Sequence, residues 1–238
     1  MEKENSQFLR TELLLGAAAM DKLQNAHVLL AGVGAVGGMA AEVLARTGVG
    51  RITVIDFDTV DITNINRQIV ALCSTVGMKK IDVMAARIKD INPSCKIAAL
   101  DLRLTPENIK AVLQEHKPDI VLDAIDDVSA KTNLIAEAAR ADITCISSMG
   151  AAMRTDPARI KTDTIKNSNG CPLARAVRKN LNRMGIDTGK IYCTYSDQPI
   201  TDSIALARDD SGTKPSYAPM TMAMGLQLAF AAVRNIIV

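Results

Sequence analysis

The chain has 238 residues, of which 48% are apolar, and its 28 basic and 26 acidic residues leave a formal net charge of +2. This balance excludes an intrinsically disordered chain and a collagen-like repeat. Aromatic residues make up only 3% and tryptophan is absent. We therefore expect an aliphatic core, as in parallel sheets covered by helices, and no aromatic platform on which several bases stack.

The five cysteines form no C-x-x-C pair, which argues against a disulfide scaffold and a cysteine-rich zinc site. The charged N-terminal segment does not resemble a signal peptide, so the predicted location is the cytoplasm. Residues 218–233 carry no charge but include Pro219, Thr221 and Gln227. Because this stretch is short for a membrane span, it predicts a buried or dimer-packing helix, and membrane association is not expected.

Short apolar runs alternate with helix-length segments in the first 150 residues. The predicted strands are 27–31, 51–55, 97–100, 119–122 and 143–146, and the predicted helices are about 36–47, 79–91, 106–116 and 129–141. This alternation indicates βαβ units and a mainly parallel sheet. Gly48 is predicted to end the first helix, and Thr105-Pro106 to begin the third.

The pattern changes after residue 150. Residues 160–165 and 190–195 are predicted strands, and residues 172–184 are a predicted helix. The polar stretch 196–216 contains prolines and a glycine and is predicted to be a mobile loop.

These elements predict an α/β fold in one domain over residues 1–238. A Rossmann-like, mainly parallel sheet with helices on both faces is expected over about 26–150. A C-terminal extension with antiparallel strands is expected over about 151–238, where we predict substrate binding and dimer packing.

A glycine motif follows the first predicted strand and opens a helix: Gly32-Val33-Gly34-Ala35-Val36-Gly37. Gly32 would make the turn, Gly34 would let a phosphate approach the backbone, and Gly37 would let helix and strand pack closely. Asp56 lies 19 residues beyond the last glycine, where a carboxylate can accept hydrogen bonds from ribose hydroxyls. The alternative is a tight turn that binds no ligand.

The residues that follow favour a triphosphate over a dinucleotide, although a nicotinamide cofactor also satisfies the glycine motif. Asp58 adds a second acid, and the cations Arg67 and Lys80 could reach the β- and γ-phosphates. Asp126, at the end of another strand, could hold Mg²⁺ beside them. The alternative for Arg67 and Lys80 is that each forms only a surface ion pair.

Basic residues are concentrated in residues 154–190, which contain nine Lys or Arg and three acids, a balance of +6. This segment is either a surface for a polyanion or a solvated helix face.

Several short motifs together resemble the ubiquitin-activating type of adenylating enzymes, namely GVGAVGG, IDFD, TNINRQ, the lysine of VGMKK, and DAIDD. The resemblance implies ATP and Mg²⁺ as cofactors and a homodimer in which Arg10 enters the partner subunit's site. It implies that Gly34 lies against the phosphates and Asp56 binds ribose. The implied catalytic residues are Arg10, Arg67, Lys80 and Asp126, with Asp126 on Mg²⁺, and the other nucleotide-binding residues are Gly32, Gly37, Asp58, Asn64 and Gln68.

Within that superfamily, the absence of C-x-x-C pairs disfavours the sulfur-carrier adenylyltransferases. The motifs RTELL, ISSMGA, DP at 156–157 and CPLA at 171–174 resemble the tRNA threonylcarbamoyladenosine dehydratase branch. This resemblance implies ATP-dependent cyclisation of N6-threonylcarbamoyladenosine through an acyl-adenylate. With tRNA as the implied substrate, the +6 balance of residues 154–190 predicts that this segment binds tRNA phosphates, with Arg175, Arg178 and Lys179 as the predicted tRNA-binding residues.

Two other functions stay open from the sequence. One is adenylation of the C-terminal Gly-Gly of a ubiquitin-like sulfur carrier, and the other is an NAD-binding oxidoreductase or nucleotide-sensing module. Cys171 is interpreted as a packing residue, with a sulfur acceptor or acyl carrier as the alternative, and relatives associate with sulfur-transfer proteins. Cys73, Cys95 and Cys145 are expected in the core, and His27 and His116 are expected to be structural.

Overall fold

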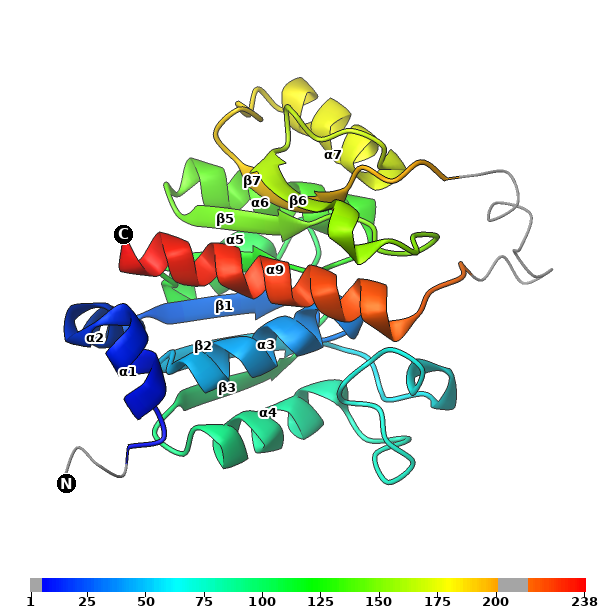
Figure 1. Ribbon diagram of the computed structural model, residues 1–238. Coiled ribbons are helices and arrows are strands. Elements are labelled where there is room, and N and C mark those ends of the chain that lie inside the picture. Colours follow the sequence, from blue (N-terminus) through cyan, green and yellow to red (C-terminus); the bar gives the residue numbers. More distant parts are fainter. Residues whose placement is uncertain (1–5, 201–213) are drawn as a thin grey trace.

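The computed structural model describes residues 6–200 and 214–238, and its centre is one seven-stranded sheet (Figure 1). The strand order is β3-β2-β1-β4-β5-β7-β6. Only the β6–β7 pair is antiparallel, so the predicted Rossmann-like sheet with an antiparallel extension is confirmed. The strands are β1 His27–Ala31, β2 Arg51–Asp56, β3 Lys96–Asp101, β4 Ile120–Asp123, β5 Thr144–Ser148, β6 Ile160–Thr164 and β7 Tyr192–Ser196.

The strand order reverses at β1, which pairs in parallel with β2 on one side and with β4 on the other. In open α/β sheets, ligands bind in the crevice outside the carboxyl ends of the strands at such a reversal. The glycine motif follows β1, and the acidic run 123–127 follows β4. The topology therefore brings two separate motifs to the two sides of one crevice.

Helices cover both faces of the sheet because its central strands are apolar on both sides. On β1, Val28 and Leu30 pack into one core cluster, and Leu29 and Ala31 pack into the other. The first cluster is covered by α3 Ala35–Thr47, α4 Lys80–Ile91 and α9 Ala218–Ile237, and the second by α5 Ile109–His116, α6 Val128–Arg140 and α7 Pro172–Arg183.

Two short helices, α1 Leu9–Leu15 and α2 Ala17–Asn25, precede the sheet and were not predicted. They lie beside the C-terminal end of α9 (Figure 1), where Lys22 Nζ donates to Ile237 O at 2.9 Å. Helix α9 crosses α3 closely, since a Cβ on Gly225 would lie 2.4 Å from Val36 O.

Helix α9 is the one helix in the described residues that is long and apolar enough to cross a membrane, and 44% of its most apolar window is buried. Its buried face includes Met220, Met224 and Leu228, while Leu226 and Phe230 are about half exposed on the other face. This amphipathic burial agrees with the predicted packing helix.

Three details differ from the sequence predictions. Helix α5 begins at Ile109 and not at Pro106, because residues 105–108 form a separate turn in which Asn108 N donates to Thr105 O at 3.1 Å. Cys73 is exposed, since it lies in the looped segment between residues 64 and 79 and not in the core. The predicted mobile loop 196–216 lies largely outside the described residues.

Candidate functional site

The glycine loop is shaped by backbone contacts that exclude larger residues. Gly32 has a φ of +90°, and a Cβ on Gly37 would lie 1.9 Å from Gly32 O. At Gly34, by contrast, a Cβ would meet nothing nearer than Gln68 Nε2 at 4.0 Å. Gly32 and Gly37 therefore build the turn, while Gly34 leaves open space at the N-terminus of α3, where helix N–H groups favour an anion.

Asp56 ends β2 and holds this loop in place. Its Oδ2 accepts from Val33 N at 2.7 Å, and its Oδ1 accepts from Asp58 N at 2.9 Å. The residue is 9% exposed. Each carboxylate oxygen has a second lone pair, so Asp56 can position the glycine loop and still accept a bond from a ribose hydroxyl.

Lys80 is the buried cation of the crevice. It is 5% exposed, and its Nζ pairs with Asp58 Oδ2 at 2.8 Å. The neighbouring Lys79 instead faces outward to Asp101. Asp58, predicted to bind the nucleotide, thus contacts Lys80 and fixes the direction in which its ammonium points.

The segment 61–68 carries the remaining residues predicted to bind the nucleotide, on one short 3₁₀ helix and the turn after it. Asp61 caps the helix, with Asn64 in a reciprocal capping box. Its hydrogen bonds with Thr63 lower the pKa of Asp61. The partly exposed Arg67 donates to Thr63 O at 3.0 Å and to Asn66 Oδ1 at 2.8 Å.

Gln68 supplies an observation that points to a ligand. Its side chain is 8% exposed, yet its Oε1 has no hydrogen-bond partner. A buried polar atom without a partner costs free energy, which a bound ligand can recover. Because the Gln68 amide lies beside the open space at Gly34, these residues fit a nucleotide bound along the loop.

A buried network behind the acidic run was missed by the sequence analysis. Lys131 is completely buried on α6, and its Nζ contacts Asp123 Oδ2 at 2.7 Å and Ser148 O at 2.9 Å. Ser147 Oγ donates to the same Asp123 oxygen at 2.6 Å. A lysine on the buried face of an amphipathic helix was the signal that could have revealed it. The network fixes the ends of β4 and β5, and with them the loop that carries Asp126.

Asp126 itself is exposed at the carboxyl end of β4. The described residues contain no group of three or more His, Cys, Asp or Glu that could hold a metal ion. Mg²⁺ commonly binds through one or two carboxylates together with substrate phosphates. Asp126 therefore fits such a site only when a nucleotide supplies the other oxygens.

Arg10 lies far from this crevice within its own chain. Phe8, two residues earlier, contacts the position of Gly48 at the C-terminal end of α3. The glycine loop is at the opposite end of this 13-residue helix, which is about 20 Å long. Arg10 is exposed on α1 and is not brought to the other predicted site residues.

The basic segment separates into exposed and internally bonded residues. Arg175 and Lys179 are exposed on α7. Arg178, by contrast, donates through Nη1 to Ile165 O at 3.0 Å and to Ser168 O at 2.8 Å. The three predicted tRNA-binding residues therefore lie on one helix, but one of them holds the loop that precedes it.

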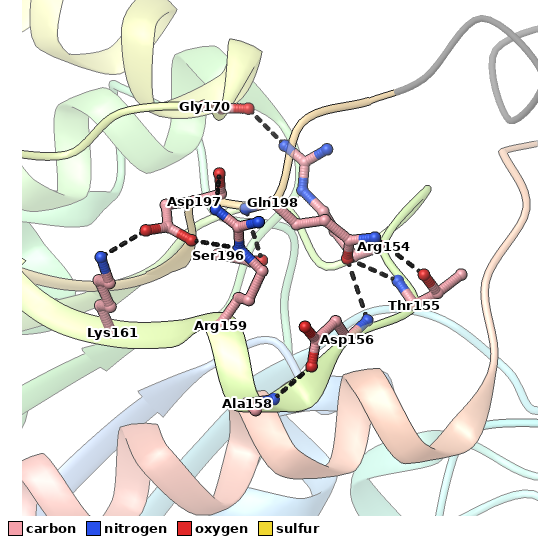
Figure 2. A network of polar contacts seen from close by, with 10 residues as sticks. All are labelled: Arg154, Thr155, Asp156, Ala158, Arg159, Lys161, Gly170, Ser196, Asp197 and Gln198. Carbon is pink, nitrogen blue, oxygen red and sulfur yellow. Dashed lines mark hydrogen bonds and ion pairs between the residues drawn. The ribbon is translucent and has the colours of Figure 1, made fainter.

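A second part of that basic charge is paired with one carboxylate (Figure 2). Arg159 Nε contacts Asp197 Oδ1 at 2.8 Å, and Lys161 pairs with the other oxygen. The hydrogen bonds from Lys161 and Arg159 lower the pKa of Asp197. These cations tie the start of β6 to the end of β7 and contribute less to a surface patch than their number suggests.

The structure agrees with the interpretation of His27 as a structural residue and of Cys145 as a core residue. His27 is buried and shares a 2.9 Å hydrogen bond with Thr53 Oγ1, and burial lowers its pKa. Burial also raises the pKa of the Cys145 thiol, and it raises that of Cys193 to about 12. These groups are suited to packing and not to nucleophilic chemistry at neutral pH.

Comparison with known proteins agrees with this geometry. The family model described as ThiF family matches residues 7–237. Over 192 residues, the chain is 46% identical to the tRNA threonylcarbamoyladenosine dehydratase of Bacillus subtilis, covering 81% of this chain and 75% of that protein. It is 42% identical to the Escherichia coli protein of the same name over 72% of this chain and 63% of the relative.

The fold is also similar to a crystal structure of that E. coli dehydratase in complex with ATP. The TM-score is 0.88 at 34% identity, and the match covers 97% of this chain and 93% of the other. The similarity thus extends through the sheet, the crevice and the C-terminal extension.

Proposed function

The chain belongs to the ThiF family, and we propose that it uses ATP to dehydrate N6-threonylcarbamoyladenosine in tRNA. The observation that carries this proposal is the match, over nearly the whole chain, to a dehydratase crystallised with ATP. The crevice at the strand reversal supports it, because its loop, buried carboxylate and buried lysine suit a nucleoside triphosphate.

ATP would lie along the glycine loop. Its ribose would bond to Asp56, and its phosphates would pass over Gly34 toward Arg67 and Lys80. The unsatisfied Gln68 Oε1 supports this position, since it belongs to the side-chain amide whose Nε2 adjoins Gly34. The buried network behind β4 would present Asp126 to Mg²⁺, which supplies charge neutralisation at the phosphates when bound.

The reaction would proceed in two balanced steps. A threonine carboxylate oxygen attacks the α-phosphorus of ATP, and pyrophosphate leaves. The ureido group of the same nucleoside then attacks the activated carbonyl carbon and loses a proton, and AMP departs with the carboxylate oxygen. Because the attacking carboxylate is already ionised, the first step needs no strong base. Positioning and cationic stabilisation by Arg67 and Lys80 would supply most of the catalysis.

A homodimer would complete the site. Within its own subunit, Arg10 lies on the side opposite the glycine loop. It would therefore reach into the crevice of the partner subunit. Exposed apolar residues near it and on α9 support an interface: Leu13, Leu14, Leu226 and Phe230.

Mixing Arg10→Ala chains with Asp126→Ala chains tests this arrangement. If Arg10 acts in trans, heterodimers regain one intact site, and activity returns after subunit exchange. If subunits exchange and activity does not return, Arg10 acts in cis or not at all.

The tRNA backbone would contact the exposed cations Arg175 and Lys179 of α7, within the extension. A cytoplasmic location and a sulfur-transfer partner remain predictions of the sequence.

Incubation with ATP, Mg²⁺ and threonylcarbamoyl-modified tRNA, followed by nucleoside mass analysis, tests the function. We expect the nucleoside to lose the mass of one water while AMP and pyrophosphate form. The Lys80→Ala variant should be about 10²–10³-fold slower, and Lys79→Ala should keep nearly full activity. An unmodified mass with wild-type protein contradicts the proposal. Adenylation of a carrier protein's C-terminal Gly-Gly would instead favour the sulfur-carrier function.

A further inference from the structure

The described residues contain a buried arginine whose charge the protein does not balance. Arg154, in the loop after β5, is 2% exposed. Its Nη2 donates to Gly170 O at 2.5 Å, whereas its Nε and Nη1 have no hydrogen-bond partner. Burying an arginine with two unused donors is costly unless an anion meets them.

The helix next to Arg154 also has hydrogen-bond donors that no side chain caps. Gly170 precedes Cys171, the N-cap of the 12-residue helix α7, and no side chain caps this N-terminus. Pro172 has no N–H, so Leu173 and Ala174 carry the uncapped N–H groups of the first turn. A helix N-terminus favours an anion through these donors and the helix dipole.

The two features meet at one place. Figure 2 draws the Arg154 guanidinium reaching toward Gly170, which lies just before α7. Burial lowers the pKa of Arg154, and the neighbouring Cys171 partly offsets this. Arginine nevertheless keeps its charge at neutral pH. Gly150 lies beside Cys171, since a Cβ on Gly150 would be 3.7 Å from Cys171 Sγ. Because residue 150 is a glycine, no side chain fills this position.

We propose that Arg154 and the N-terminus of α7 form a binding site for a phosphate group. Two unused guanidinium donors and the first-turn N–H groups match the several acceptor oxygens of phosphate. The source is either inorganic phosphate or a phosphodiester of the tRNA, and the second source rests on the proposed function. Its residues differ from those of the nucleotide crevice, since Arg154 follows β5 whereas the crevice lies between the ends of β1 and β4.

Thermal unfolding tests the site without requiring activity. The nucleotide crevice is first filled with a non-hydrolysable ATP analogue, and phosphate is compared with chloride at equal ionic strength. Phosphate should raise the Tm of the wild type by several degrees, because a ligand that binds only the folded state stabilises it. Arg154→Gln keeps a donor for Gly170 O but lacks the charge, and should lose this shift. Arg159→Met, which removes a neighbouring cation, should keep it.

A second variant keeps the test valid if Arg154→Gln fails to fold. Cys171→Asp places a carboxylate at the N-cap, where Asp is favoured and can meet Arg154. This variant should have a higher Tm in chloride and show no further shift with phosphate. The site is overturned if phosphate does not shift the wild type, if Arg154→Gln shifts equally, or if Cys171→Asp retains the full shift.

The dehydration assay identifies the source. If the phosphate belongs to tRNA, Arg154→Gln should raise the KM for tRNA about tenfold, leave the KM for ATP unchanged and reduce the salt slope by about 0.7 to 0.9. If it is inorganic phosphate, the KM for tRNA stays the same while the Tm result persists. A wild type that does not dehydrate tRNA refutes the proposed function alone, because the Tm experiment is independent of it.

Discussion

The nucleotide half, residues 26–150, and the C-terminal extension are held in shape by different kinds of contact. In the first, backbone atoms define the site: Gly37 packs against Gly32 O, and Asp56 accepts two backbone N–H groups. In the extension, side chains dominate, as where Arg159 and Lys161 share Asp197. The first half therefore tolerates little change in backbone shape, whereas the extension depends on which cations are already paired.

The glycine loop gives the largest expected effect. Gly37→Ala should destabilise the fold by more than about 4 kcal/mol, because its Cβ would collide with the backbone at Gly32. Gly34→Ala is the matched control, since its Cβ meets open space; it should fold normally but bind ATP more weakly. Chemical denaturation and ATP titration measure the two effects. Equal stability of both variants would contradict the backbone account.

In the same half, variants of the adjacent lysines Lys79 and Lys80 distinguish a catalytic cation from a surface ion pair. Lys80→Ala should lower kcat by about 10²–10³-fold, the usual loss for a removed transition-state charge contact. Lys79→Ala should change kcat less than twofold, since Lys79 faces Asp101 outside the crevice. Pyrophosphate exchange into ATP measures both. Comparable losses in the two variants would remove Lys80 from the site.

In the extension, substitutions on α7 should affect either stability or RNA binding, depending on which cation is changed. Arg178→Ala should cost about 1–3 kcal/mol of stability, because it leaves the carbonyls of Ile165 and Ser168 without this donor. The Arg175→Ala/Lys179→Ala double variant should unfold like wild type but bind tRNA with a salt slope reduced by about 1.4 to 1.8. Unfolding curves and salt-dependent tRNA binding report these outcomes. An unchanged slope would make α7 only a solvated face.

The smallest expected effect is a pH dependence in the nucleotide half. Burial opposes ionisation of Glu42, but hydrogen bonds from Arg87 and Arg46 outweigh it and lower its pKa. A lowered folded-state pKa stabilises the protein above the unfolded value near 4.5, and this contribution is lost as the pH falls. Glu42→Gln should thus cost about 1 kcal/mol at pH 7, since Arg46 and Arg87 are partly exposed. Denaturation at pH 7 and at progressively lower pH should show this difference shrinking as the pH falls below 4.5, and a difference that does not shrink would contradict the assignment.

The sequence predicted the nucleotide half well because its signals are local. Alternating apolar runs placed the strands, and Gly48, which ends α3 in the left-handed region, was identified as a helix stop. The turn at 105–108 was missed, because in the sequence alone Thr105-Pro106 has the residue types of an N-cap and a first helical position.

In the extension, the sequence predicted the two strands and the helix α7 but could not predict the ion pairs, because the paired residues are distant in the chain. Arg159 and Asp197 are 38 residues apart, and the count of nine cations does not reveal which are paired. Lys131 was missed for a similar reason, since its hydrogen-bond partners lie at the ends of β4 and β5. Charge composition predicts a basic surface, but only the fold assigns each cation to it.

The proposed function depends on one step, in which the crevice activates a carboxylate of the RNA as an acyl-adenylate. Isotopically labelled oxygen in the threonine carboxylate tests this most directly, with AMP, phosphate and nucleoside analysed by mass after a single turnover. We expect one labelled oxygen in AMP for each nucleoside that loses water. Label in inorganic phosphate with formation of ADP, or dehydration without labelled AMP, would contradict the account.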